Sequence, residues 1–164
     1  MFKFWIPAVL WMLLIFSFSS QPYHQQDMRP WLQDKLPETF IKENFSHIKV
    51  NYAGSEVSIQ TKGVPGFIEF FVRKGAHVFV YTVLAILIQW AVRLTWRRIG
   101  KWGYLITFFL TFLYAMSDEW HQAFTPNRTP KIHDVFIDSF GILLGLLIFI
   151  VLQRLFLSRK GKHV

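Results

Sequence analysis

Long apolar segments separated by short charged turns constrain this chain more than any other feature. A helix needs roughly 17–25 mostly apolar residues to cross a bilayer. The sequence predicts transmembrane helices at about 2–18, 66–92, 102–120 and 132–152. Hydrophobic residues make up 52% of the 164 residues, more than a soluble domain of this length can bury. We therefore expect an all-α integral membrane protein, with residues 1–164 forming a single domain built on a four-helix transmembrane bundle.

Unbalanced positive charge gathers in two connections of the predicted bundle. The turn 93–101 carries four basic residues and no acid, and the tail after the last span is also basic. Residues 19–65 instead balance five basic side chains against five acidic ones. The positive-inside rule then predicts that both termini and the 93–101 turn lie in the cytoplasm.

The composition also excludes several classes of protein. The net charge of +8 does not indicate nucleic-acid binding, because the basic residues form short clusters beside apolar segments instead of a continuous stripe. The absence of cysteine excludes a disulfide framework, a thiolate metal site and a cysteine nucleophile. The lipid bilayer is thus the expected partner, and the sequence leaves the oligomeric state open.

The predicted extracytoplasmic insert, residues 19–65, separates the first two spans. Its stretch PETFIKENF is typical of a short amphipathic helix. The stretch IKVNYAGSEVSIQ alternates apolar and polar residues around Ala53-Gly54-Ser55, as a small β-hairpin does. The alternative is a weakly ordered cap lying on the membrane, and the sequence favours neither.

Ionisable and polar residues recur inside the last three predicted spans, and helical spacing places each set on one face of its helix. They are Lys74, His77 and Tyr81 in the second span, Asp118, Glu119 and Gln122 in the third, and Asp134 and Asp138 in the fourth. Gly141 and Gly145 continue the last stripe as a small-residue packing surface.

Residue counting places these groups at one depth. His77, Asp118 and Asp138 each lie 16 residues from the cytoplasmic end of their span (positions 93, 102 and 154), which is roughly 24 Å at 1.5 Å per residue. Charged groups at that depth are costly in hydrocarbon, so they pair with one another or line a polar cavity. Two interpretations follow: an ion-pair network that only locks the helices together, or an outward-facing polar pocket.

The pocket interpretation assigns a role to each residue. The candidate catalytic residues are His77, Asp118, Glu119 and Asp134, and the candidate binding residues are Lys74, Tyr81, Gln122, Arg128 and Asp138. A histidine with clustered carboxylates can supply a general acid and base. The same groups can hold a divalent cation such as Mg²⁺, Mn²⁺, Ca²⁺ or Zn²⁺, although their spacing matches no established metal motif. Glu69 and Arg73 are expected to balance each other outside the site.

Three stretches resemble the VanZ-like membrane proteins: SSQP (19–22), KGAHVFVYTVLAIL (74–87) and LYAMSDEWHQAFTPNRTPKIHDVFIDSFGILLG (113–145). The resemblance covers all four spans and places the family's recurrent positions on the candidate residues above and on Gly141. The position of Asp138 is often Asn in that family, so Asp adds a charge here. The resemblance implies a bacterial cytoplasmic membrane protein. The family's namesake is associated with resistance to teicoplanin, a glycopeptide that binds cell-wall precursors.

Two functions fit these features, and a third fits less well. A binding protein for a lipid-linked cell-wall precursor or glycopeptide would hold phosphate with its cations and sugar or peptide with its acids. A membrane-embedded hydrolase or transferase would use the histidine and carboxylates on a lipid headgroup. A transporter is disfavoured, because no chain of ionisable residues reaches the predicted cytoplasmic side.

Overall fold

The computed structural model describes residues 2–125 and 132–160, and their side chains as far as Leu155. Helices make up most of the chain. The elements are η1 (Phe2–Phe4), α1 (Ile6–Ser19), η2 (Tyr23–Gln25), α2 (Arg29–Lys35), α3 (Glu38–Phe45), β1 (Lys49–Tyr52), β2 (Ser55–Ser58), α4 (Ile59–Thr95), α5 (Trp102–Gln122) and α6 (Ile132–Lys160).

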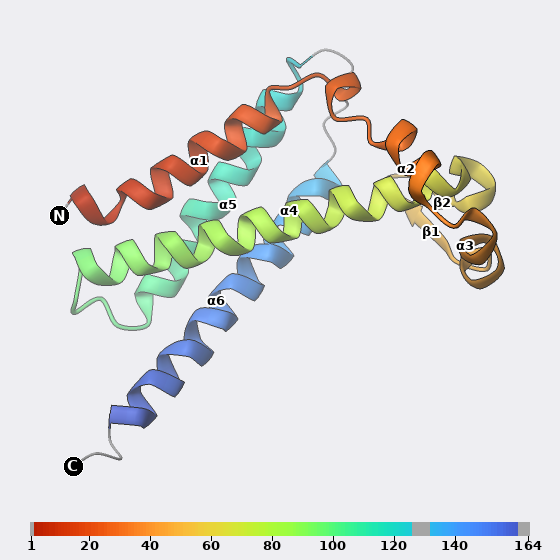
Figure 1. Cartoon of the computed structure of the whole chain (residues 1–164). Coiled ribbons are helices and arrows are strands. Elements are labelled where there is room, and N and C mark those ends of the chain that lie inside the picture. The colour runs from red at the N-terminus through yellow and green to blue at the C-terminus, as the bar shows by residue number, and fades with distance from the viewer. Residues whose placement is uncertain (1, 126–131, 161–164) are drawn as a thin grey trace.

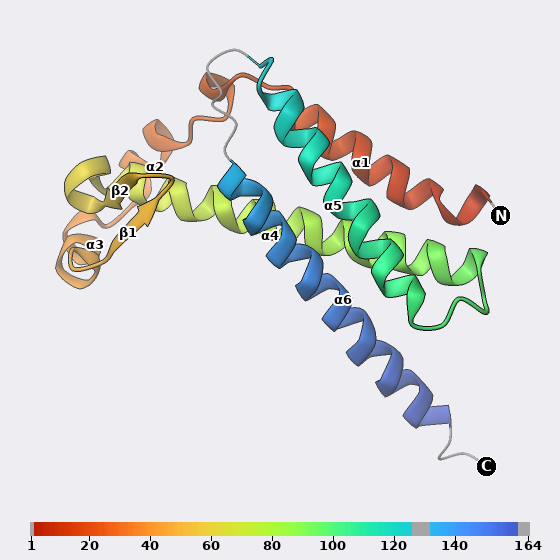
Figure 2. The same cartoon turned by 180° about the vertical axis from the view of Figure 1, so that it is seen from behind.

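Helix α4 is the central element of the molecule. It packs mainly against α6, and also against α5 and α1. Figures 1 and 2 show the N-terminus, the α4–α5 turn and the C-terminal end of α6 at one end, and the β-hairpin with α2 and α3 at the other. The two basic connections therefore lie at the same end, opposite the hairpin.

The helices are those of a membrane protein. Among the described residues, α4 and Ile132–Leu155 of α6 are long and apolar enough to cross a bilayer, and α1 would add a third span if it were counted with Tyr23–Lys35, from which it is bent by 104°. The expected four spans are therefore not confirmed. Alone, α1 has only 14 residues. Helix α5 has 21 residues, but its last turns carry polar and acidic side chains that lower its mean hydropathy.

Exposed apolar side chains recur every three or four residues along α5 and α6. On α5 they are Leu105, Phe109 and Leu113, and on α6 they are Phe136, Phe140, Leu143 and Leu147. A contiguous apolar stripe on the outside of a bundle is unfavourable in water and suits contact with lipid. The outer surfaces of both helices thus agree with a bilayer environment.

The α4–α6 contact depends on two glycines. A Cβ on Gly141 would lie 2.6 Å from the Val78 carbonyl oxygen, and one on Gly145 would lie 2.4 Å from that of Thr82. Thr82 also donates its hydroxyl to the Gly141 carbonyl at 2.9 Å. This close approach confirms the small-residue packing surface that the spacing of Gly141 and Gly145 predicts.

The helix and hairpin expected in the insert are both present. Strands β1 and β2 pair antiparallel with Tyr52 opposite Ser55. The two turn residues, Ala53 and Gly54, have φ values of 51° and 77°, as a tight hairpin turn requires. One face of the insert packs on α4 through a small apolar core of Ile41, Val57, Ile59, Val64 and Phe67.

Helix α4 begins at Ile59, earlier than the expected start at residue 66. The Ser58 side chain accepts the Thr61 backbone N–H, and the Thr61 side chain accepts that of Ser58, so the chain enters a helical turn directly from β2. At Gly63, φ of 68° and ψ of 170° interrupt the helix before Pro65. Helix α6 likewise runs to Lys160, past the expected end at 152. In α4, the expected start at residue 66 followed the helix-breaking signals Gly63 and Pro65, so the helical turn before them was not predicted.

Candidate functional site

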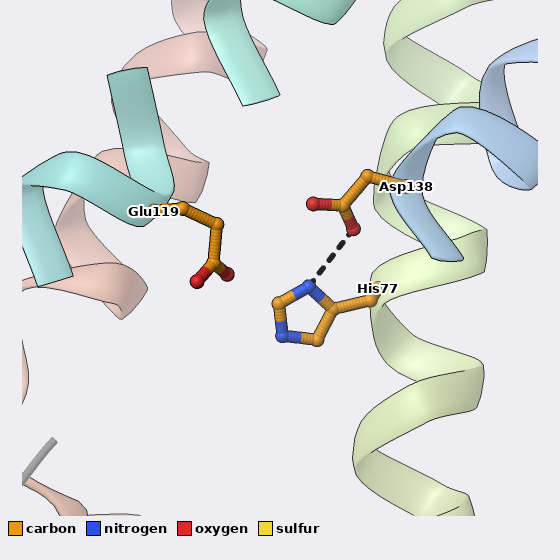
Figure 3. Close-up of side chains that lie close together, drawn as sticks. All are labelled: His77, Glu119 and Asp138. Carbon is orange, nitrogen blue, oxygen red and sulfur yellow. Dashed lines mark hydrogen bonds and ion pairs between the residues drawn. The ribbon is translucent and has the colours of Figure 1, made fainter. Parts of the chain in front are cut away.

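The packing of α4 on α6 brings two pairs of ionisable side chains together. His77 Nδ1 lies 3.0 Å from Asp138 Oδ1, and Figure 3 shows the imidazole and the carboxylate facing each other from the two helices. One turn closer to the hairpin, Lys74 forms an ion pair with Asp134. Asp138 precedes Gly141 on the same face of α6. The close approach of α4 and α6 at Gly141 therefore brings Asp138 within reach of His77.

Helix α5 adds two further acids to this cluster. Asp118 is buried and accepts a hydrogen bond from Gln122 Nε2 at 3.2 Å. Glu119 is also buried, and its carboxylate points toward His77 and Asp138 in Figure 3. One ligand atom from each of His77, Glu119 and Asp138 lies within 4.8 Å of the others, so these three residues can hold a metal ion.

Counting residues along the predicted spans therefore placed the polar groups of the last three spans correctly relative to one another. Residues from three helices, far apart in the sequence, meet at one level of the bundle. Among the candidates, Arg128 lies outside the described residues, and its placement stays a prediction.

A cavity of about 790 Å³ opens beside this cluster, within the range of small-molecule binding sites. Its polar end is lined by ionisable, hydroxyl and amide side chains, and its other walls are apolar or aromatic. The polar lining residues are Ser19, Tyr23, Gln26, Tyr52, Arg73, Lys74, His77, Asp118, Gln122 and Asp134; the apolar and aromatic ones include Trp11, Leu14, Ile15, Phe18, Phe70, Phe79, Val80 and Tyr81.

The apolar part of the cavity lies between α1 and α4. Leu14, Phe18 and Phe79 line it and are themselves 40–60% exposed, so it opens toward the surface that suits lipid. Trp11 donates its indole N–H to the Val80 carbonyl at 2.9 Å and joins the two helices at this point. The cavity thus has a polar end at the ionisable cluster and an apolar wall open to the side.

Two candidate residues do not line this cavity. Asp138 is fully buried, and Glu119 is 5% exposed, while His77 and Asp118 belong to the lining. Asp138 contacts the His77 imidazole, which does line the cavity, and its expected binding role stays a prediction. Tyr81 does line the cavity, although it is almost entirely buried.

Sequence reasoning missed Tyr52 as a member of the cluster. Its hydroxyl donates to Asp134, and the Lys74 ammonium lies 4.6 Å from the centre of its ring. Burial and the Asp134 carboxylate raise the pKa of Tyr52, so it remains a donor at neutral pH. The only sequence signal was a tyrosine at the end of a strand, beside a hairpin turn. It does not indicate which helix the hairpin packs against, so it could not place Tyr52 next to Asp134.

The expected pair of Glu69 and Arg73 is confirmed at 3.2 Å. Its environment differs from the expectation in one respect, because the Arg73 side chain also lines the cavity. Arg73 donates to the Gln26 carbonyl at 3.0 Å and lies 4.4 Å from the centre of the Tyr23 ring. The pair thus ties the chain after α1 to α4 at the rim of the polar end.

One buried carboxylate oxygen in the cluster has spare hydrogen-bonding capacity. Asp138 Oδ2 has no hydrogen-bond partner within residues 2–125 and 132–155, whereas the Tyr81 and Ser19 hydroxyls lie beside the Asp118 carboxylate. Buried polar atoms without partners are uncommon and often mark a site that acquires a ligand. The arrangement can therefore hydrogen-bond a polar headgroup, and the His77–Asp138 pair can orient an imidazole for proton transfer.

Comparison with known proteins gives one match. The family model VanZ/LLP1 matches residues 4–153, nearly the whole chain. A search of curated proteins and a search of solved structures each found no match. The match includes every described residue of the polar cluster and both glycines of the α4–α6 contact. The chain therefore belongs to the VanZ/LLP1 family.

Proposed function

We propose that this protein binds the headgroup of a lipid-linked molecule, such as a cell-wall precursor, in an outward-facing pocket of the bacterial cytoplasmic membrane. One observation carries the proposal: the cavity joins an ionisable end to an apolar wall that is open between α1 and α4. An amphiphile matches both parts, because its headgroup can meet the polar cluster while its chain stays in lipid.

The polar lining favours a headgroup with both phosphate and hydroxyl or amide groups. Lys74 and Arg73 supply cationic donors at the rim, suited to phosphate oxygens. Asp118 and Gln122 supply acceptors and an amide deeper in the cluster, suited to hydroxyl or amide groups. This mixture fits a phosphate-linked sugar or polyol better than a purely apolar or purely anionic ligand. A link to glycopeptide resistance through such a precursor is part of the proposal.

Native mass spectrometry of the purified protein tests headgroup binding. Phosphatidylglycerol and a polyprenyl phosphate should each bind one molecule per chain more tightly than phosphatidylcholine, and Lys74→Gln should weaken both. The matched control is Lys42→Gln, since Lys42 also pairs with a carboxylate (Glu38, 2.8 Å) but lies on α3 away from the cavity. Equal binding of all three lipids, or equal loss in both variants, would contradict the proposal.

We also propose four membrane passages, with both termini in the cytoplasm and the insert outside. The basic 93–101 turn and C-terminal tail support this orientation. The chain lacks cysteine, so single cysteines can be introduced in place of Val50 and Arg97. An impermeant maleimide added to intact cells should label position 50 and not position 97, and the reverse pattern would overturn the topology.

Catalysis on the headgroup is the second candidate function. The observation that favours it is the His77–Asp138 pair, in which a buried carboxylate orients an imidazole that lines the cavity. Lipid mass spectrometry of cells with and without the protein tests it. A lipid species that changes with the wild type but not with His77→Gln would establish turnover, whereas an unchanged lipidome would leave binding alone.

A further inference from the structure

We propose that His77, Glu119 and Asp138 form a binding site for one divalent transition-metal ion of the Mn²⁺–Zn²⁺ class. The three side chains come from α4, α5 and α6, and one ligand atom of each lies within 4.8 Å of the others. Ligands bound at about 2.0–2.2 Å around a single ion lie within about 4.4 Å of one another, so small side-chain movements would close this set on an ion.

A second observation points to a ligand at this place. Asp138 is fully buried, yet only one of its oxygens is used, by His77, and Oδ2 has no hydrogen-bond partner among the described residues. In Figure 3 the free oxygen of Asp138 is directed to the side of Glu119. A buried carboxylate oxygen needs a proton, a donor or a cation. The neighbouring imidazole and second carboxylate make a cation the occupant that uses all three groups.

The donor set selects the kind of metal. One imidazole nitrogen with two carboxylates suits Mn²⁺, Fe²⁺ or Zn²⁺. Ca²⁺ prefers an all-oxygen set of six to eight ligands, which three side chains including a histidine do not supply. Three protein ligands would also leave an open coordination position, as in metal sites that bind a further group.

A metal ion here would also change the charge of the cavity. The rim cations Lys74 and Arg73 are already paired with Asp134 and Glu69. A divalent ion held beside His77, itself a lining residue, would balance the Glu119 and Asp138 carboxylates and offer an electrophilic coordination position. The open position would then suit a phosphate oxygen of the ligand. This step rests on the proposed headgroup function, whereas the metal site itself does not.

Metal analysis and spectroscopy test the site directly. The protein is purified with an affinity tag free of histidine, stripped with a chelator, refilled in lipid nanodiscs and analysed for metal content. We expect one Mn²⁺ or Zn²⁺ per chain and no stoichiometric Ca²⁺. Pulsed electron paramagnetic resonance of the Mn²⁺ form should show coupling to an imidazole ¹⁴N nucleus, a readout on the wild type that needs no variant.

Two variants and a matched control assign the ligands. Asp138→Asn and His77→Gln should each weaken metal binding by about 100-fold or more, since even outer-shell partners of a metal contribute 10–100-fold. The control is Asp118→Asn, which removes a buried carboxylate next to Glu119 in sequence but outside the trio, and should cost no more than about 10-fold.

The outcomes separate this inference from the headgroup proposal. No metal in the refilled wild type, no ¹⁴N coupling, or equal loss in all three variants would overturn the metal site, whatever the lipid titrations give. If phosphatidylglycerol binds one to one in chelator-treated protein, the headgroup pocket stands without the metal. Metal binding without lipid binding would retain the site and remove the pocket.

Discussion

Two buried carboxylates near the hairpin end of the bundle differ in how completely they are satisfied. Glu69 is 3% exposed, and its oxygens receive Arg73 at 3.2 Å, the Met28 N–H at 3.3 Å and the Tyr23 hydroxyl at 3.1 Å. Asp138 is fully buried and interacts with His77 through one oxygen, while the other has no hydrogen-bond partner in the described part of the chain.

This difference separates a structural role from a functional one. Glu69 joins the chain after α1 to α4, and burial together with the Glu69 carboxylate raises the pKa of Tyr23, which keeps that donor protonated. Both oxygens of Glu69 are used in holding the fold. One oxygen of Asp138 is left for a donor or cation that the described residues do not supply. The free energy of unfolding and the hydrogen exchange of single variants distinguish these two roles.

The largest effect is expected from Glu69→Ala. The variant leaves Arg73, Tyr23 and the Met28 N–H without their acceptor in a buried region, so it should lower the unfolding free energy by about 3 kcal/mol. Denaturant titration in mixed micelles measures it. Glu43→Ala is the control, since Glu43 is exposed on α3 and should change stability by less than about 0.5 kcal/mol. Similar values for the two variants would remove the structural role of Glu69.

Tyr52→Phe should have the next largest effect. Asp134 resembles Glu69 in having both a cation and a tyrosine as partners, since Lys74 and the Tyr52 hydroxyl both contact its Oδ1. The phenylalanine ring keeps the packing against Phe70 and the Lys74 ammonium but loses the hydroxyl donor, a cost of about 1.5 kcal/mol for a hydrogen bond to a charged group. Hydrogen exchange should become faster in β1 and β2. Unchanged exchange there would mean that Tyr52 does not anchor the hairpin.

Asp138→Asn should change stability in the opposite direction. In chelator-treated protein the variant removes a buried charge that is only partly compensated, while its amide can still hydrogen-bond to His77, and we expect a gain of about 1 kcal/mol. The same denaturant titration measures it beside Glu69→Ala. A loss as large as that of Glu69→Ala would mean that Asp138 is also a structural ion pair, and the contrast between the two carboxylates would disappear.

The smallest effect concerns Asp27, a partly exposed neighbour of the Glu69 group. Its hydrogen bond from Arg29 holds the pKa of Asp27 at about 2, below the ordinary value of 3.8. The stabilisation is therefore present above pH 3.8 and is lost as the pH falls through 2. Asp27→Asn should cost about 0.5 kcal/mol at pH 7, as exposed pairs do, and less at pH 3. An equal cost at both pH values would contradict this assignment.

The common level of the polar residues could be predicted because a helix rises by a constant distance per residue. That rise was enough to place His77, Asp118 and Asp138 at one depth, but not to tell which side chains pair. The hairpin was predicted from its alternation and turn residues. What joins these parts was not predictable in the same way. The position of Tyr52 depends on the break at Gly63 and on apolar contacts between the insert and α4.

The lateral opening of the cavity could also not be predicted from the sequence. Helix α1 is apolar on nearly all sides, so its pattern does not tell which face meets α4 and which meets lipid. Trp11 joins the two helices through a hydrogen bond to a backbone carbonyl and a ring contact with Phe79, which no sequence pattern reveals. The number and direction of the spans stay predictions: charge patterning supports them, and among the described residues only α4 and α6 are long and apolar enough on their own.

Photocrosslinking in cells tests most directly whether the cavity between α1 and α4 holds an anionic lipid headgroup. Phe79 and Phe109 form a matched pair, because they are 60% and 59% exposed and only Phe79 lines the cavity. We place p-benzoylphenylalanine at either position and identify the crosslinked lipids by mass spectrometry. Adducts at position 79 should be enriched in anionic lipids over the bulk membrane, and Lys74→Gln should abolish that enrichment. Adducts of bulk composition at both positions, with or without Lys74, would contradict the account.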